Sequence, residues 1–88
     1  MAHAKPTDLK DLSVLLEKIR EVSALKEKST GCFYFKSKGV LHFHVQKGRR
    51  FAHVFTGEKW CEVDLEAGLS DRKQAAIFKS IASLLPLS

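Results

Sequence analysis

Three histidines and a glutamate stand at spacings that could bind a metal ion. His42 and His44 are two residues apart on a predicted strand, and His53 is expected opposite His42 on the next strand. Glu62 is expected opposite His53 in turn. Side chains two apart on a strand point the same way about 6.5–7 Å apart, and opposed pairs have Cβ atoms about 5 Å apart. Three imidazoles and a carboxylate could then share one zinc-like ion. A flat sheet supplies neither a pocket nor outer partners, so a solvated polar cluster is the competing interpretation.

Four aromatic side chains are expected on the same side of the sheet, namely Tyr34, Phe51, Phe55 and Trp60. Such rings could stack the bases of a single-stranded nucleic acid. Positive charge would come from the two ends of the hairpins, with Lys36, Lys38 and Lys59 at one end and Lys47, Arg49 and Arg50 at the other. Basic residues at hairpin tips also keep sheets soluble and block pairing between edges, so nucleic-acid binding is an alternative and not the leading interpretation.

Self-association would use the same rings with fewer assumptions. Two sheets packed back to back would bury large side chains that are worth about 1.5–3 kcal/mol each when fully buried. We therefore expect a non-enzymatic binding or homo-oligomerisation module, whose partner is a second copy or another protein, ahead of nucleic-acid binding and metal binding. The chain has no nucleophile elbow, no phosphate-binding glycine loop and no HExxH motif. We accordingly predict neither an enzyme nor a cofactor.

Two amphipathic helices should cover one side of the sheet. In the first, apolar residues recur at three- and four-residue spacing, which predicts a helix over about residues 8–27 with Thr7 as its N-cap. That stripe consists of Leu9, Leu12, Leu15, Leu16, Ile19, Val22 and Leu25. A second helix is expected over about residues 71–85, capped by Ser70 and stopped by Pro86.

Three turns set the register of four predicted strands, at about residues 31–36, 40–46, 50–55 and 60–65. Gly57 suits the first central position of a two-residue turn, and Lys47 with Gly48 can close the preceding hairpin in the same way. Residues 37–39 are expected to form a three-residue loop with a left-handed Gly39. The resulting pairs are Phe55 with Trp60, Val54 with Cys61, His53 with Glu62, Val45 with Arg50, His44 with Phe51, Phe43 with Ala52, His42 with His53, Phe35 with Leu41, Tyr34 with His42 and Phe33 with Phe43.

This register sorts the strand residues onto two faces. The face toward the helices carries Phe33, Phe35, Leu41, Phe43, Val45, Ala52, Val54, Cys61, Val63 and Leu65. The other, which we call the open face, carries Tyr34, His42, His44, Phe51, His53, Phe55, Trp60 and Glu62. Strand side chains alternate, so moving one turn by a residue would expel an apolar set, and the agreement supports the register. The prediction is an α+β fold of one domain over residues 1–88: helix, four-stranded antiparallel meander, helix, with both helices on one face.

Composition narrows the classes further. The 88 residues include 44% hydrophobic and 28% charged positions, as in a globular domain. The net charge of +5 suits an anionic partner but separates nucleic-acid binders poorly from other basic proteins. Cys32 and Cys61 are expected on opposite faces, which argues against a disulfide. Charged residues precede any apolar run at the start of the chain and nothing resembles a membrane span, so we expect a cytoplasmic protein with no membrane partner.

One segment resembles a known group of proteins. The chain is similar to the FYxKSKxxLHFH…G…FAxV core of a family of short uncharacterised bacterial proteins. The similar residues are Cys32-Phe-Tyr-Phe-Lys-Ser-Lys, Leu41-His-Phe-His, Gly48 and Phe51-Ala52-x-Val54. The similarity covers about a quarter of the chain, and His53 replaces the acidic residue of that pattern. The resemblance implies a bacterial, cytosolic α+β domain and no particular activity.

Overall fold

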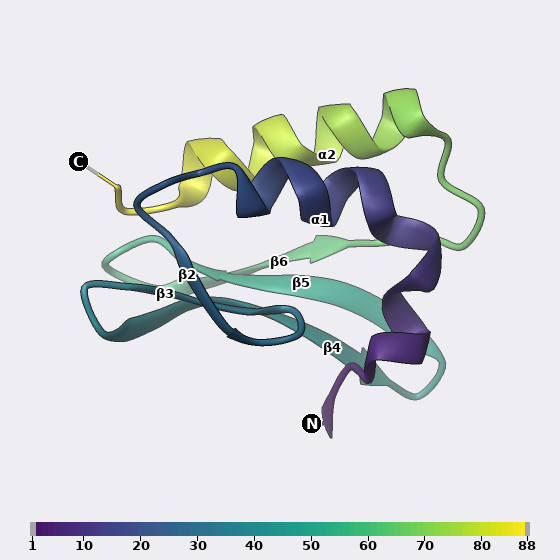
Figure 1. Cartoon of the computed structure of the whole chain (residues 1–88). Helices are drawn as coiled ribbons and strands as arrows, with labels where there is room; N and C mark the ends of the chain where they lie inside the picture. The colour runs from purple at the N-terminus through teal and green to yellow at the C-terminus, as the bar shows by residue number, and fades with distance from the viewer. Residues whose placement is uncertain (1, 88) are drawn as a thin grey trace.

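The computed structural model describes residues 2–87, and it places two helices on one side of an antiparallel sheet (Figure 1). In chain order the elements are β1 (Ala2–His3), the 3₁₀ helix η1 (Pro6–Leu12), α1 (Ser13–Arg20), β2 (Lys26–Ser29), β3 (Cys32–Phe35), β4 (Lys38–Gln46), β5 (Arg49–Phe55), β6 (Trp60–Asp64) and α2 (Asp71–Leu84). The sheet order is β2-β3-β4-β5-β6. β4 pairs with β5 along one edge, and its other edge is shared by β1 and β3. The predicted α+β class is confirmed.

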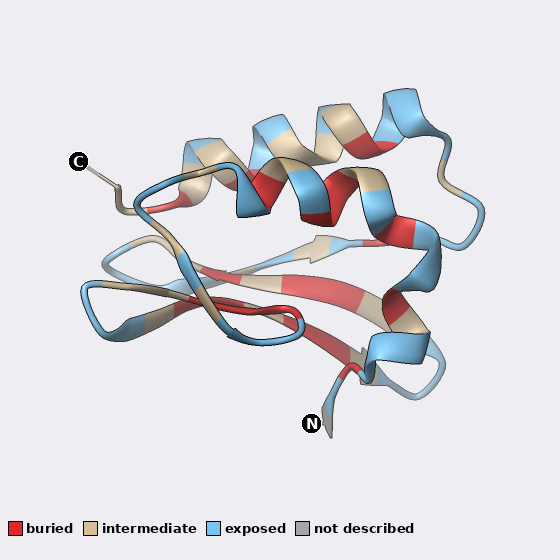
Figure 2. Ribbon diagram, in the orientation of Figure 1, coloured by how far each residue is buried: buried red, intermediate tan, exposed pale blue. Residues whose placement is uncertain are grey.

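The main core lies between the helices and the sheet (Figure 2). Apolar residues of η1, α1 and the C-terminal end pack against the helix-facing residues of β3, β4 and β5. The largest fully buried side chains of this cluster are Phe33, Phe43, Leu9, Leu12, Leu15, Ile19, Leu41 and Ile81. Each large side chain buried here stabilises the fold by about 1.5–3 kcal/mol before entropy is counted. Neither α1 nor α2 is long and apolar enough to cross a lipid bilayer.

The first helix is shorter than predicted, and its C-terminal part is a strand. α1 ends at Arg20, and Lys26–Ser29 forms β2 against β3, so the sheet has one more long strand than expected and the two-residue β1 besides. Glu27 fixes this turn, because its carboxylate accepts bonds from Arg20 Nε at 2.6 Å and from the Gly31 amide at 3.0 Å. The apolar spacing continues through Val22 and Leu25, but both follow the helix, and Leu25 reaches the core from the loop.

The caps differ at the two helices. The predicted cap at Thr7 is wrong: the helical segment starts at Pro6, and the Asp8 carboxylate accepts a bond from the Lys5 amide at 2.8 Å. Proline suits the first position of a helix, because a backbone N–H at that position has no partner within the helix and proline carries none. The second helix, predicted for residues 71–85, is Asp71–Leu84. Its predicted cap is confirmed, since the Ser70 hydroxyl oxygen accepts a bond from the Lys73 amide at 3.2 Å.

The last two hairpins have the predicted register, and the first one does not. His42 pairs with His53, and Phe55 pairs with Trp60. The pairs expected between residues 33–35 and 41–43 are wrong, because Cys32 pairs with His42, Phe33 with Leu41, Tyr34 with Gly39 and Phe35 with Lys38. The turn is made by Lys36 and Ser37, whose φ angles are +50° and +69°, and not by a left-handed Gly39. A bulge in β4 after Gly39 restores the alternation, so Phe33 still faces the helices.

Candidate functional site

A fourth histidine joins the open face through the N-terminal strand. β1 pairs with β4 so that His3 lies opposite His44, and the Ala4 amide donates to the Phe43 carbonyl at 2.8 Å. Ring centroids of His3 lie 5.0 Å from His42 and 4.9 Å from His44. His3 is not recognisable as a site residue from the sequence, because a two-residue strand has no alternation that would reveal it.

His3, His42 and His44 form the tightest group of potential metal ligands in residues 2–87, and we call them the histidine triad. One ring nitrogen from each lies within 4.8 Å of the other two. His44 is buried and His42 is half-buried. Burial, followed by the charges of His3, His44 and His53, lowers the pKa of His42 below its usual 6.5. The neutral imidazole, which is the form that binds metals, is therefore favoured at His42.

A thiol lies next to the triad. Cys32 is opposite His42 in the β3–β4 pair, is buried, and has its Sγ 3.6 Å from His3 Nδ1. Cys61 pairs with Val54 on the other side of the sheet, as the predicted separation of the two cysteines required. A soft sulfur ligand is thus available beside three imidazoles.

Two of the predicted metal ligands lie outside the triad. The ring centroid of His53 is 5.5 Å from that of His44 and 4.8 Å from that of Trp60, so His53 belongs to the face but not to the ligand group. The Glu62 carboxylate accepts a bond from Arg49 Nη2 at 2.6 Å. Arg49 also forms an ion pair with Asp64 at 2.7 Å. The Glu62 carboxylate, which was predicted to be a metal ligand, is therefore bound to the Arg49 guanidinium instead.

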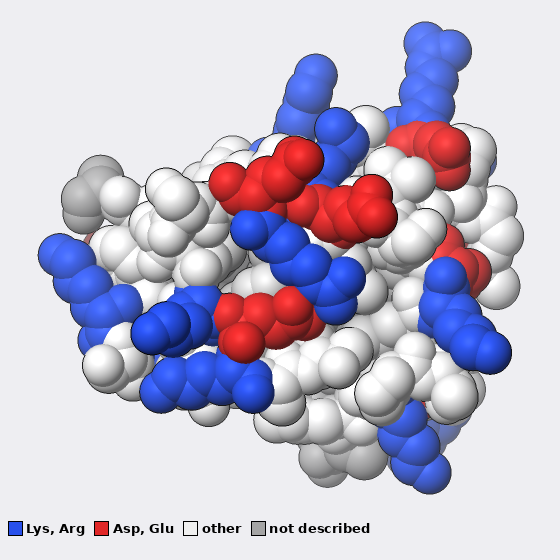
Figure 3. Space-filling model, in the orientation of Figure 1, with Lys and Arg blue, Asp and Glu red and all other residues white. Residues whose placement is uncertain are grey.

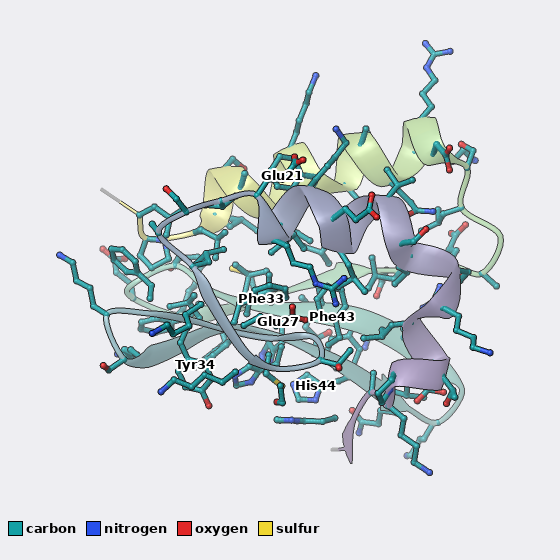
Figure 4. All side chains as sticks on the ribbon, in the orientation of Figure 1. Glu21, Glu27, Phe33, Tyr34, Phe43 and His44 are labelled. Atoms are coloured by element: carbon teal, nitrogen blue, oxygen red, sulfur yellow. The ribbon has the colours of Figure 1, made fainter. Side chains whose placement is uncertain are left out.

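Aromatic and imidazole rings form a continuous line across β3, β4, β5 and β6. Centroid distances along it are 6.5 Å from Tyr34 to His42, 5.5 Å from His42 to Trp60, 4.8 Å from Trp60 to His53 and 5.2 Å from Trp60 to Phe55. Figure 4 shows Tyr34 and His44 on the side of the sheet away from the helices, with Phe33 and Phe43 between sheet and helices. Phe55 also packs against the edge of the helix-side core.

Phe51 lies on the open face as predicted, yet it is fully buried. Its exposed fraction is 0%, and that of the neighbouring His44 is 5%. The Phe51 ring is 5.5 Å from the His44 ring and 6.0 Å from the His53 ring, and the Arg49 guanidinium carbon lies 4.7 Å above it. Part of the face is therefore a second, small core. Trp60, 40% exposed, is the one large hydrophobic residue classed as exposed in residues 2–87.

The predicted basic residues divide into arginines that form ion pairs and lysines that form none with any residue the structure describes. Arg50 donates to the Asp11 carboxylate at 2.7 and 3.0 Å and to the Asp8 carbonyl at 2.7 Å, which ties η1 to β5. The Arg50 hydrogen bond, against a smaller opposing effect of burial, lowers the pKa of Asp11. Lys36 and Lys38 point over rings, 5.2 Å from the Phe35 centroid and 4.2 Å from the Phe55 centroid respectively. The remaining two, Lys47 and Lys59, are exposed at hairpin turns.

No protein-family model matches the chain, and neither does a curated protein or a solved structure. The resemblance to short bacterial proteins therefore stays a prediction. The geometry of the open face is what a functional proposal must be built on.

Proposed function

We propose that this protein is a small non-enzymatic binding module that holds a transition-metal ion on its open face through His3, His42 and His44. The observation that carries the proposal is the convergence of one nitrogen from each ring to within 4.8 Å. β1 and β4, which are far apart in sequence, supply these rings. Tertiary structure therefore brings the ligands together, which supports a binding site more strongly than a local run of histidines would. Imidazole suits zinc, copper and nickel better than calcium or magnesium.

The triad is close to the dimensions that such an ion needs. Nitrogens that share a tetrahedral zinc at 2.0–2.1 Å lie about 3.4 Å apart, so the triad nitrogens, which lie within 4.8 Å of one another, need to close by up to about 1.4 Å. Side-chain rotation supplies that movement, because His3 is exposed on an edge strand. The fourth position would be filled by water or by the Cys32 thiolate, whose sulfur already contacts His3. The lowered pKa of His42 reduces competition from protons at that ligand.

The sharpest test compares two histidines of the same face. Zinc titration of the metal-free protein by calorimetry should give one equivalent per chain, and His42→Ala should weaken binding by about 100-fold or more, since loss of a mere supporting group costs 10–100-fold. His53→Ala is the matched control, because His53 lies on the same face but outside the triad. Equal losses for both variants, or no zinc uptake by the unmodified protein, would contradict the proposal.

Cobalt identifies the fourth ligand in the same protein. A thiolate bound to Co²⁺ gives a sulfur-to-metal charge-transfer band, and a site of nitrogen and water does not. If Cys32 contributes, Cys32→Ser removes that band while cobalt stays bound to the histidines. Absence of the band in the unmodified protein assigns the fourth position to water.

Self-association through the open face has weaker support than the sequence pattern suggests. Phe51 and His44 are already buried within one chain, and Trp60 is left as the exposed large hydrophobic side chain. A stable interface buries about 800 Å² on each partner, and Trp60 alone would cover only a small part of that area. We expect light scattering of the metal-free protein to give the mass of one chain, 9.9 kDa, over a wide concentration range. A mass that doubles with concentration, and returns to one chain in Trp60→Ala, would instead support a dimer.

A further inference from the structure

A concavity lies where the loop between α1 and β2 meets the turn between β3 and β4. Its polar lining consists of Ser23, Lys26, Lys28, Tyr34, Lys36 and Ser37. Figure 3 shows basic side chains gathered at the end of the molecule where β2 and the β3–β4 turn lie. The lining thus combines three ammonium groups with three hydroxyls, and it contains no carboxylate.

These three lysines have no acidic partner in the described part of the chain. Within residues 2–87 no carboxylate lies at ion-pair distance from any of them, whereas Arg20 and Arg50 are each paired with one carboxylate and Arg49 is paired with two. Lys28 Nζ lies 4.6 Å from the Tyr34 ring centroid. The nearest candidate in sequence, Glu27, is held by Arg20 and the Gly31 amide. The concavity therefore carries uncompensated positive charge, which favours an anion.

Edge protection explains only part of this arrangement. β2 is an edge strand, and lysines on edge strands block pairing with other chains. That role accounts for Lys26 and Lys28. Solubility at a hairpin tip would explain Lys36 by itself, but neither role calls for the hydroxyls of Ser23, Tyr34 and Ser37 around the same hollow. Lysine ammonium and hydroxyl groups together are the donors that phosphate oxygens accept from.

The hollow also opens onto the line of rings. Tyr34 belongs to both, since it lines the concavity and its ring centroid lies 6.5 Å from that of His42. The line then continues to Trp60. We propose that this pocket binds the phosphate group of a nucleotide, free or at the end of a single strand, whose base lies along the rings that begin at Tyr34. Aromatic side chains stack on any base, which suits a ligand recognised mainly by its phosphate.

The test uses protein stripped of metal with EDTA, so it does not depend on the histidine triad. Amide spectra of ¹⁵N-labelled protein are recorded during titration with inorganic phosphate, adenosine monophosphate and a short oligothymidylate strand. We expect the phosphate-bearing ligands to shift the amides of residues 23–28 and 34–37. Tighter binding of adenosine monophosphate than of phosphate assigns a role to the rings, and tighter binding of the strand favours nucleic acid over free nucleotide.

Matched charge variants separate the pocket from bulk attraction. Lys26→Gln combined with Lys36→Gln should weaken adenosine monophosphate binding by about tenfold, the equivalent of 1.4 kcal/mol. Lys73→Gln combined with Lys79→Gln removes the same charge from exposed positions of α2 and should leave binding unchanged. Equal weakening by both pairs, or shifts confined to other parts of the chain, would overturn the pocket. Equal affinity for phosphate and adenosine monophosphate would overturn the assignment of a nucleotide.

Discussion

Phe51→Ala will lower the free energy of unfolding by about 3–5 kcal/mol, the cost of removing a fully buried aromatic ring. The alternation of β5 places this residue on the open face, where a binding residue would cost little to remove. The structure instead gives it an exposed fraction of 0%, under His44, His53 and the guanidinium of Arg49. A domain of this size has a total stability of about 5–15 kcal/mol, so the loss should be evident as a large shift of the urea midpoint.

Two further variants serve as controls for Phe51→Ala. Phe51→Leu keeps most of the volume and should cost less than about 1.5 kcal/mol. Trp60→Ala removes a larger ring from the same face, but that ring is 40% exposed and its loss should cost only about 1 kcal/mol. If Phe51→Ala unfolds at the same urea concentration as the unmodified protein, then the open face has no core of its own and Phe51 is available to a partner.

The parts of the fold that the sequence predicts correctly are those with explicit local signals. Gly48 and Gly57 both have positive φ angles in the structure, +77° and +103°, and the hairpins that they close have the predicted register. The first hairpin lacks such a signal. In its turn Lys36 and Ser37 have left-handed backbone conformations, which few non-glycine residues adopt. The nearby Gly39 suggests a different loop.

Other differences arise from contacts between distant residues. The helical spacing through Val22 and Leu25 predicts a continued helix, but Glu27 binds Arg20 and the Gly31 amide and so stabilises a turn into β2. The same limit applies to the candidate site. Alternation places Glu62 on the open face, yet it does not tell whether a metal or Arg49 takes the carboxylate. His3 reaches the site only through tertiary pairing of β1 with β4.

Zinc bound at the proposed site should raise the free energy of unfolding by about 4 kcal/mol when its free concentration is 1,000-fold above the dissociation constant, because the triad is assembled only in the folded chain. His3→Ala should abolish this gain while changing the metal-free stability little, because His3 is exposed on a two-residue edge strand. His53→Ala should keep the gain. Urea unfolding with and without zinc measures all three proteins. A gain retained in His3→Ala would place the metal elsewhere.

The pH dependence of that gain follows from the protonation of the ligands. Each imidazole must be neutral to bind zinc, so protons compete with zinc for the ring nitrogens as the pH falls. In the folded protein, burial lowers the pKa of His42 below 6.5, and the charges of His3, His44 and His53 lower it further. This histidine therefore stays neutral in the folded chain at a pH where it is already protonated in the unfolded chain, and the metal-free protein loses stability between those two pKa values. The zinc gain should decrease as the pH is lowered and the ring nitrogens take up protons, and a gain that did not change with pH would require ligands other than histidine.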